Sequence, residues 1–127
     1  MNNLSQYILE KFKISKDIDI NSDGYIHDNI TDDFRKLYKI ISKEFGKDHP
    51  ALDSLVAMSD FDEDDNFYYK FSDNGWFSFL RDVVNYDWIS LGRNGAIDVN
   101  NSNHKDIAKI IKKWNRLDIG KKVWESF

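Results

Sequence analysis

The residues of this 127-residue chain whose types and spacing could bind a metal ion lie near its N-terminus. Asp19, Asn21 and Asp23 alternate along the segment, and Gly24 follows the last of them. Calcium takes about six to eight oxygen ligands, so three alternate side chains and the backbone carbonyl of Tyr25 would supply part of its shell. Glycine permits the sharp bend of such a loop. Calcium binding is therefore one chemistry that this spacing indicates.

The segment from Asp19 to Ile30 resembles the calcium loop of EF-hand and dockerin proteins, with the pattern D-x-[DN]-x-[DN]-G-x-I. Ile26 then takes the eighth position. The last position of an EF-hand loop carries a bidentate carboxylate, and here that position is Ile30. Losing this ligand would weaken calcium binding, so we treat a calcium loop as the alternative interpretation of this segment.

The interpretation that we favour for the same segment is a β-hairpin, with strands Asp17–Ile20 and Tyr25–Asp28 joined by Ser22-Asp23-Gly24. A three-residue loop with glycine last is typical of a type I turn followed by a G1 bulge. This register places Ile20 and Ile26 on one face of the hairpin.

A second hairpin of the same form is predicted between Trp88 and Val99, around the loop Arg93-Asn94-Gly95. Every apolar residue of its strands falls on one side, which supports this register. The expected cross-strand pairs are Leu91 with Ile97 and Ile89 with Val99.

The negative charge of the protein is concentrated between Ser59 and Trp88. This stretch has eight acidic residues against two basic ones, a net charge of −6, whereas the whole chain carries −4. It also contains ten of the 19 aromatic residues. Such a stretch is more typical of a binding surface than of a catalytic centre.

Five carboxylates lie within six residues in the run Asp60–Asp65. Charges packed this closely repel one another unless a cationic surface meets them, and tyrosine gives a large contact area at low entropy cost. The alternative is that the aromatic residues form the core and the acidic residues a solvated loop. A metal site on alternate carboxylates of the run is less favoured because it lacks the bend-forming glycine. The predicted contact surface for a basic protein partner consists of Asp60, Asp62, Glu63, Asp64, Asp65, Tyr68 and Tyr69.

Nothing in the sequence indicates catalysis or a cofactor. The chain has no cysteine, which excludes disulfides, thiolate metal sites and thiol catalysis. His27, His49 and His104 have no second ligand at metal spacing, so we expect surface or helix-capping roles. No nucleophile motif is present, and we expect the protein not to be an enzyme.

We expect neither a nucleic-acid nor a membrane partner. The segment Asn103–Phe127 carries a net charge of +4, but its cations lie along one face of an amphipathic helix, which is usually solvated. The chain is acidic overall and shows no groove-reading motif. No apolar stretch reaches membrane-spanning length, so the expected location is the cytoplasm.

Apolar periodicity predicts a compact α+β domain spanning residues 1–127, with about four to five helices packed against a small antiparallel sheet containing two hairpins. Thr31 is the expected N-cap of the second helix, and Val56 is expected to face inward in the third. Gly120 is expected to end the last helix, with Leu117 on its buried face. The expected helices lie at about 4–13, 31–46, 50–58, 75–85 and 104–119, and a half-buried strand with Tyr68 outward is expected at 67–71.

The chain is similar to small acidic bacterial immunity proteins of the colicin and contact-dependent-inhibition type. The similarity lies in size, lack of cysteine and catalytic motifs, abundance of Asn, Ile, Lys and Asp, and the localised acidic and aromatic segment. It implies a cytoplasmic, non-enzymatic protein that binds the basic nuclease domain of a secreted toxin through Asp60–Asp65, Tyr68 and Tyr69. A phage-type inhibitor that mimics nucleic acid would share these features.

Overall fold

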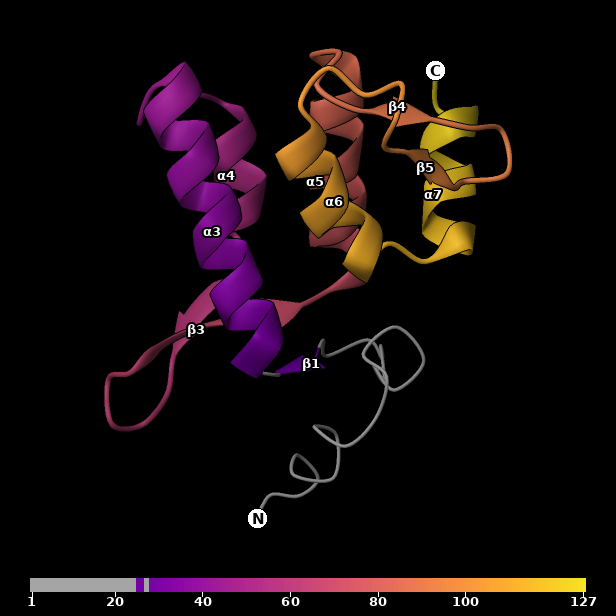
Figure 1. Ribbon diagram of the computed structural model, residues 1–127. Coiled ribbons are helices and arrows are strands. Elements are labelled where there is room, and N and C mark those ends of the chain that lie inside the picture. The colour runs from indigo at the N-terminus through magenta and orange to yellow at the C-terminus, as the bar shows by residue number, and fades with distance from the viewer. Residues whose placement is uncertain (1–24, 27) are drawn as a thin grey trace.

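The computed structural model describes residues 25, 26 and 28–127 (Figure 1). These residues form the α+β domain that the sequence predicts, with one hydrophobic core. The helices are α3 (Asp28–Phe45), α4 (Ala51–Val56), α5 (Asp73–Asn85), α6 (Lys105–Trp114) and α7 (Leu117–Glu125). The strands are β1 (Tyr25–Ile26), β2 (Ser59–Phe61), β3 (Phe67–Phe71), β4 (Ser90–Leu91) and β5 (Ile97–Asp98).

The larger sheet is antiparallel with the strand order β1-β3-β2, so the predicted strand β3 lies at its centre. Ser59 pairs with Tyr69 and Phe61 with Phe67, which makes β2 and β3 a hairpin. This hairpin extends away from α5, α6 and α7, and its loop lies at the lower left of Figure 1.

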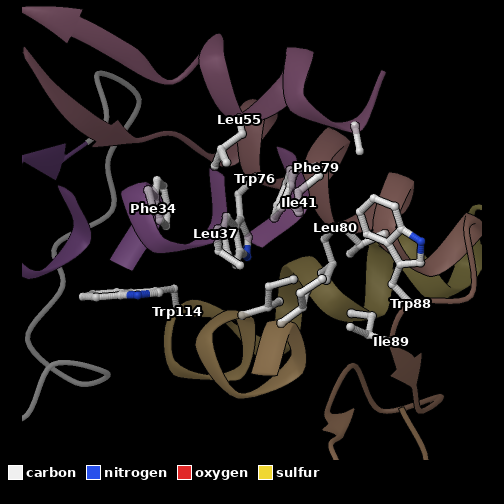
Figure 2. Packing of buried hydrophobic residues seen from close by; sticks show 14 of the residues in the cluster. Phe34, Leu37, Ile41, Leu55, Trp76, Phe79, Leu80, Trp88, Ile89 and Trp114 are labelled. Carbon is white, nitrogen blue, oxygen red and sulfur yellow. The ribbon is translucent and has the colours of Figure 1, made fainter. Parts of the chain in front are cut away.

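The core forms where the apolar stripes of the helices meet the inner face of β3. Phe34 of α3 stacks on Trp76 of α5, with ring centroids 5.4 Å apart and planes 4° from parallel. Phe71 of β3 lies against both rings. Figure 2 shows this packing around Phe34, Leu37, Ile41, Leu55, Trp76, Phe79 and Leu80. The predicted stripes of α3 and α5 are thus confirmed.

The predicted hairpin is confirmed for residues 90–98, and its strands end before the expected pair of Ile89 with Val99. Leu91 pairs with Ile97 and Ser90 with Asp98. Gly95 has a φ of +88°, the left-handed conformation that a G1 bulge requires.

The start of α3 differs from the prediction. The helix begins at Asp28, which was expected to end a strand, and Thr31 lies inside it. Thr31 is not the N-cap because it lies three residues inside the helix, and its Oγ1 instead accepts a hydrogen bond of 3.1 Å from the backbone N–H of Tyr69. The hydroxyl that the sequence predicted as a helix cap thus makes a long-range contact with β3.

The last predicted helix is broken in two. The chain leaves α6 at Asn115, which has an extended backbone with ψ of 129°, and α7 starts at Leu117. Leu117 is 59% exposed, contrary to its predicted place in the core. Gly120 lies within α7, where its backbone packs directly on that of Gly95 in the β4–β5 turn. The contact with this turn requires glycine, so Gly120 serves packing and does not end a helix.

Helix α4 ends at Val56, short of the predicted end near Met58. Val56 therefore faces solvent, with 46% of its surface exposed, and does not point inward as expected. The predicted N-terminal helix and most of the segment Asp17–Asp28 lie outside the described residues. None of the described helices is both long and apolar enough to span a membrane.

Candidate functional site

The β2–β3 hairpin brings the predicted acidic residues together on one exposed loop. Asp62 closes this loop: its Oδ1 accepts hydrogen bonds from the backbone N–H groups of Asp64 at 2.8 Å and Asn66 at 2.9 Å. The backbone N–H of Asp62 donates to the carbonyl of Asn66 at 3.0 Å. Asp65 takes a φ of +63°, a conformation that Asp tolerates better than most residues. The loop is therefore held by bonds within itself.

Asp62 differs in role from the other carboxylates of the loop. The hydrogen bond from the backbone of Asn66, helped by its side chain and by the Asp64 amide, holds the pKa of Asp62 below its usual value despite some desolvation. Glu63, Asp64 and Asp65 are exposed, and so is Asp60 in β2. Asp62 shapes the loop, whereas the other four carboxylates are displayed to solvent.

The two predicted tyrosines lie on opposite faces of β3, because successive side chains of a strand alternate. Tyr68 is half-buried, and burial, followed by the charges of Asp60 and Asp62, raises its pKa. Tyr69 is only 2% exposed and contacts Phe34 edge-on at 5.4 Å. Tyr69 is therefore a core residue, and the prediction that it joins the contact surface is wrong.

Phe61 is a surface residue that the sequence did not single out. It lies between Asp60 and Asp62, is 60% exposed, and meets Phe67 edge-on at 5.7 Å. Its partner on β3 keeps it at the hairpin surface, away from the main core. Its sequence signal is an aromatic residue flanked by two carboxylates. A hairpin register across residues 59–69 places this residue opposite Phe67.

The described residues provide no metal centre. Among them, no group of three or more His, Asp or Glu side chains could hold an ion, which argues against the alternate-carboxylate metal site in the acidic run. The side-chain ligands of the alternative calcium loop, Asp19, Asn21 and Asp23, lie outside the described residues, while Tyr25 pairs with Phe71 through the backbone of β1. Ile30, in the position of the bidentate ligand, is fully buried in the core.

Of the two described histidines, only His49 accepts a backbone hydrogen bond at the start of a helix, whereas the side chain of His104 makes no capping bond. His49 Nδ1 accepts a hydrogen bond from the Ala51 N–H at 3.1 Å at the start of α4. His104 occupies the N-cap position of α6, and its Nδ1 lies 3.1 Å from a carboxylate oxygen of Glu44. Both rings pack around Trp88, so they stabilise the junction of α3 and α6.

The chain matches no known family. Comparisons with protein-family models, with curated proteins and with solved structures all found no match. The geometry of the hairpin is thus the main guide to what the protein does.

Proposed function

We propose that the protein is a non-enzymatic inhibitor that binds a cationic protein partner through the tip of the β2–β3 hairpin. The observation that carries this proposal is the exposure of Phe61 between carboxylates on a hairpin that extends from the body of the protein. Aromatic residues are enriched in protein–protein interfaces, so an exposed ring among carboxylates in β2 suits a surface that a partner covers.

Two kinds of side chain contribute to binding in different ways. The displayed carboxylates Asp60, Glu63, Asp64 and Asp65 attract a basic surface and accelerate association. Phe61 supplies apolar area, and fully burying its ring contributes roughly 1.5–3 kcal/mol, whereas Tyr68 lies with Asp60 on the opposite face of the hairpin. The partner that suits this surface is the basic nuclease domain of a toxin, in line with the similarity to immunity proteins.

The experiment is to measure association and dissociation rates against a panel of purified basic nuclease toxin domains at several salt concentrations. The test variant neutralises the four displayed carboxylates (Asp60→Asn, Glu63→Gln, Asp64→Asn, Asp65→Asn) and keeps Asp62, which closes the loop. We expect association at low salt to slow about tenfold or more and its salt dependence to flatten. Phe61→Ala should instead accelerate dissociation.

The matched control removes the same charge from exposed acidic residues elsewhere on the surface. Its substitutions are Asp48→Asn, Asp53→Asn, Asp106→Asn and Glu125→Gln. Association should stay close to that of the unmodified protein. Equal slowing by both variants would assign the effect to net charge, and failure to bind or inhibit any member of the panel would refute the proposal.

A further inference from the structure

A groove lies beside the hairpin, between α3 and the inner face of β2 and β3. Its volume is about 360 Å³, within the range of roughly 300–1,000 Å³ that small-molecule sites occupy. The residues that line it are Arg35, Tyr38, Lys39, Val56, Ser59, Phe67 and Tyr69.

The floor of this groove is apolar and neutral. Val56 is exposed at the end of α4, beside the rings of Phe67 and Tyr69. Burial, and next the neighbouring Tyr38, raise the pKa of Tyr69 to about 12, with Arg35 opposing, so its phenol is uncharged at neutral pH. The groove thus offers apolar contact to a ligand without a negative charge in its floor.

Strand alternation keeps the acidic residues away from the groove. Ser59 pairs with Tyr69 and both line it, whereas Asp60 pairs with Tyr68 on the opposite face of the hairpin. No carboxylate lines the groove among the described residues.

Two cations occupy the helical side of the groove. Arg35 and Lys39 are four residues apart on α3 and therefore project from one face of the helix. Arg35 Nη2 donates a hydrogen bond of 3.1 Å to the carbonyl of Phe67, and its guanidinium lies 5.4 Å from the centre of the Phe67 ring. This bond holds Arg35 in place, and its other N–H groups remain for an acceptor. Neither cation forms an ion pair with any residue that the structure describes.

We propose that this groove binds a medium-chain fatty acid, with the alkyl chain against Val56, Phe67 and Tyr69 and the carboxylate between Arg35 and Lys39. An apolar floor with two cations along one side matches a ligand that is apolar except for one anionic end. A cationic amphiphile would be repelled by Arg35 and Lys39, and a neutral alcohol would leave both cations without an anion. This inference does not depend on the proposed inhibitor function.

The test uses decanoate, at concentrations below micelle formation, with the full chain. Binding is measured by calorimetry and located by amide chemical shifts, and decanol and decyltrimethylammonium serve as comparison ligands. We expect decanoate to bind more tightly than either, with shifts confined to α3, Val56 and the β2–β3 hairpin.

Variants then separate the charges of the groove from those of the helix in general. Arg35→Gln with Lys39→Gln should weaken decanoate binding about tenfold or more, because it removes two charge-assisted partners of the carboxylate. Lys36→Gln with Lys47→Gln removes the same charge from exposed positions of α3 and the turn after it that do not line the groove, and should leave binding unchanged. Lys39→Gln alone spares the Arg35–Phe67 bond, and Val56→Asp places a carboxylate at the floor, so both should weaken binding with the hairpin intact. No binding of decanoate, equal binding of decanol, or equal loss in the control variant would overturn the proposal.

Discussion

The indole Nε1 of Trp114 donates a hydrogen bond of 2.9 Å to Oδ2 of Asp33, across 81 residues of sequence. Lys113 Nζ lies 2.8 Å from the same oxygen. Asp33 is only 7% exposed and Trp114 is buried, so a single carboxylate joins α3 to α6 at the edge of the core. A buried carboxylate is tolerated only when it is paired and hydrogen-bonded, as this one is.

Removing this carboxylate should destabilise the whole domain. Asp33→Ala takes away both the acceptor of Trp114 and the counter-charge of Lys113, and we expect it to lower the free energy of unfolding by about 2–4 kcal/mol. Asp33→Asn keeps an acceptor for the indole and should cost less. Urea denaturation measures both variants, with the exposed Asp32→Asn as a control that changes stability by less than about 0.5 kcal/mol. A cost for Asp33→Ala as small as that of the control would show that the link does not stabilise the fold.

Acid should open the acidic loop only at a pH below the ordinary pKa of an aspartate. The pKa of Asp62 is lowered from 3.8, chiefly by the backbone hydrogen bond from Asn66. Because the folded loop lowers this pKa, its contribution is complete above the unfolded value and is lost as the pH falls through the folded one. The amide chemical shifts of Asp64 and Asn66, followed by NMR from about pH 6 to about pH 2, report this opening.

Two variants of Asp62 test that assignment. Asp62→Asn retains an oxygen acceptor and should remove the pH dependence while keeping the loop closed. Asp62→Ala should leave both amides exchanging rapidly with solvent at every pH. If Asp62→Asn titrated like the unmodified protein, the neighbouring carboxylates would control the loop instead.

The substitution Gly120→Ala should destabilise the protein although it lies within a helix. Alanine normally stabilises an exposed helix interior relative to glycine by about 1 kcal/mol. A Cβ at position 120 would overlap the carbonyl oxygen of Gly95, so we expect a loss of about 1–3 kcal/mol. Thermal and urea unfolding measure this change. Lys121→Ala, at an exposed position of the same helix, should be nearly neutral, and a stabilising Gly120→Ala would contradict the close contact.

Calcium should not stabilise the protein. Ile30 takes the position of the bidentate ligand and is fully buried, so its side chain serves the core. Calcium at 100 times its dissociation constant would add about 2.7 kcal/mol and raise Tm by several degrees. We expect equal Tm values in millimolar calcium and in chelator. A calcium-dependent rise that Asp23→Ala abolishes would restore the loop Asp19–Ile30 as a metal site.

Elements with strong apolar periodicity could be predicted from the sequence, and elements formed by long-range contacts could not. The alternation of apolar residues in Phe67–Phe71 predicts a strand, and the glycine of the Arg93–Gly95 turn predicts a hairpin. Strand β2 has no such signal, because Ser59–Phe61 is mostly polar and forms a strand only through pairing with β3. The break at Asn115 was missed because apolar residues continue at helical spacing beyond it.

The sequence predicted the charged residues of the candidate site but not which of its aromatic side chains are exposed. Burying the carboxylates of Asp60–Asp65 would cost desolvation energy in any fold, so their exposure could be predicted from composition. The alternation in Phe67–Phe71 already placed Tyr69 on the apolar face of the strand and Tyr68 on the other, so only the assignment of Tyr69 to the contact surface was wrong. Phe61 was overlooked because its exposure depends on its pairing with Phe67.

The closed loop at residues 62–66 is held together independently of the core. Its hydrogen bonds run between Asp62, Asp64, Asp65 and Asn66, so Glu63 and Asp64 can change their side chains without disturbing the core, whereas the positive φ of Asp65 favours Asp, Asn or Gly there. Under the proposed function, substitutions at a few exposed positions would redirect the protein to another partner, with Asp62 and Asn66 kept to close the loop. The same separation makes this loop a suitable place to graft a foreign binding sequence onto the domain.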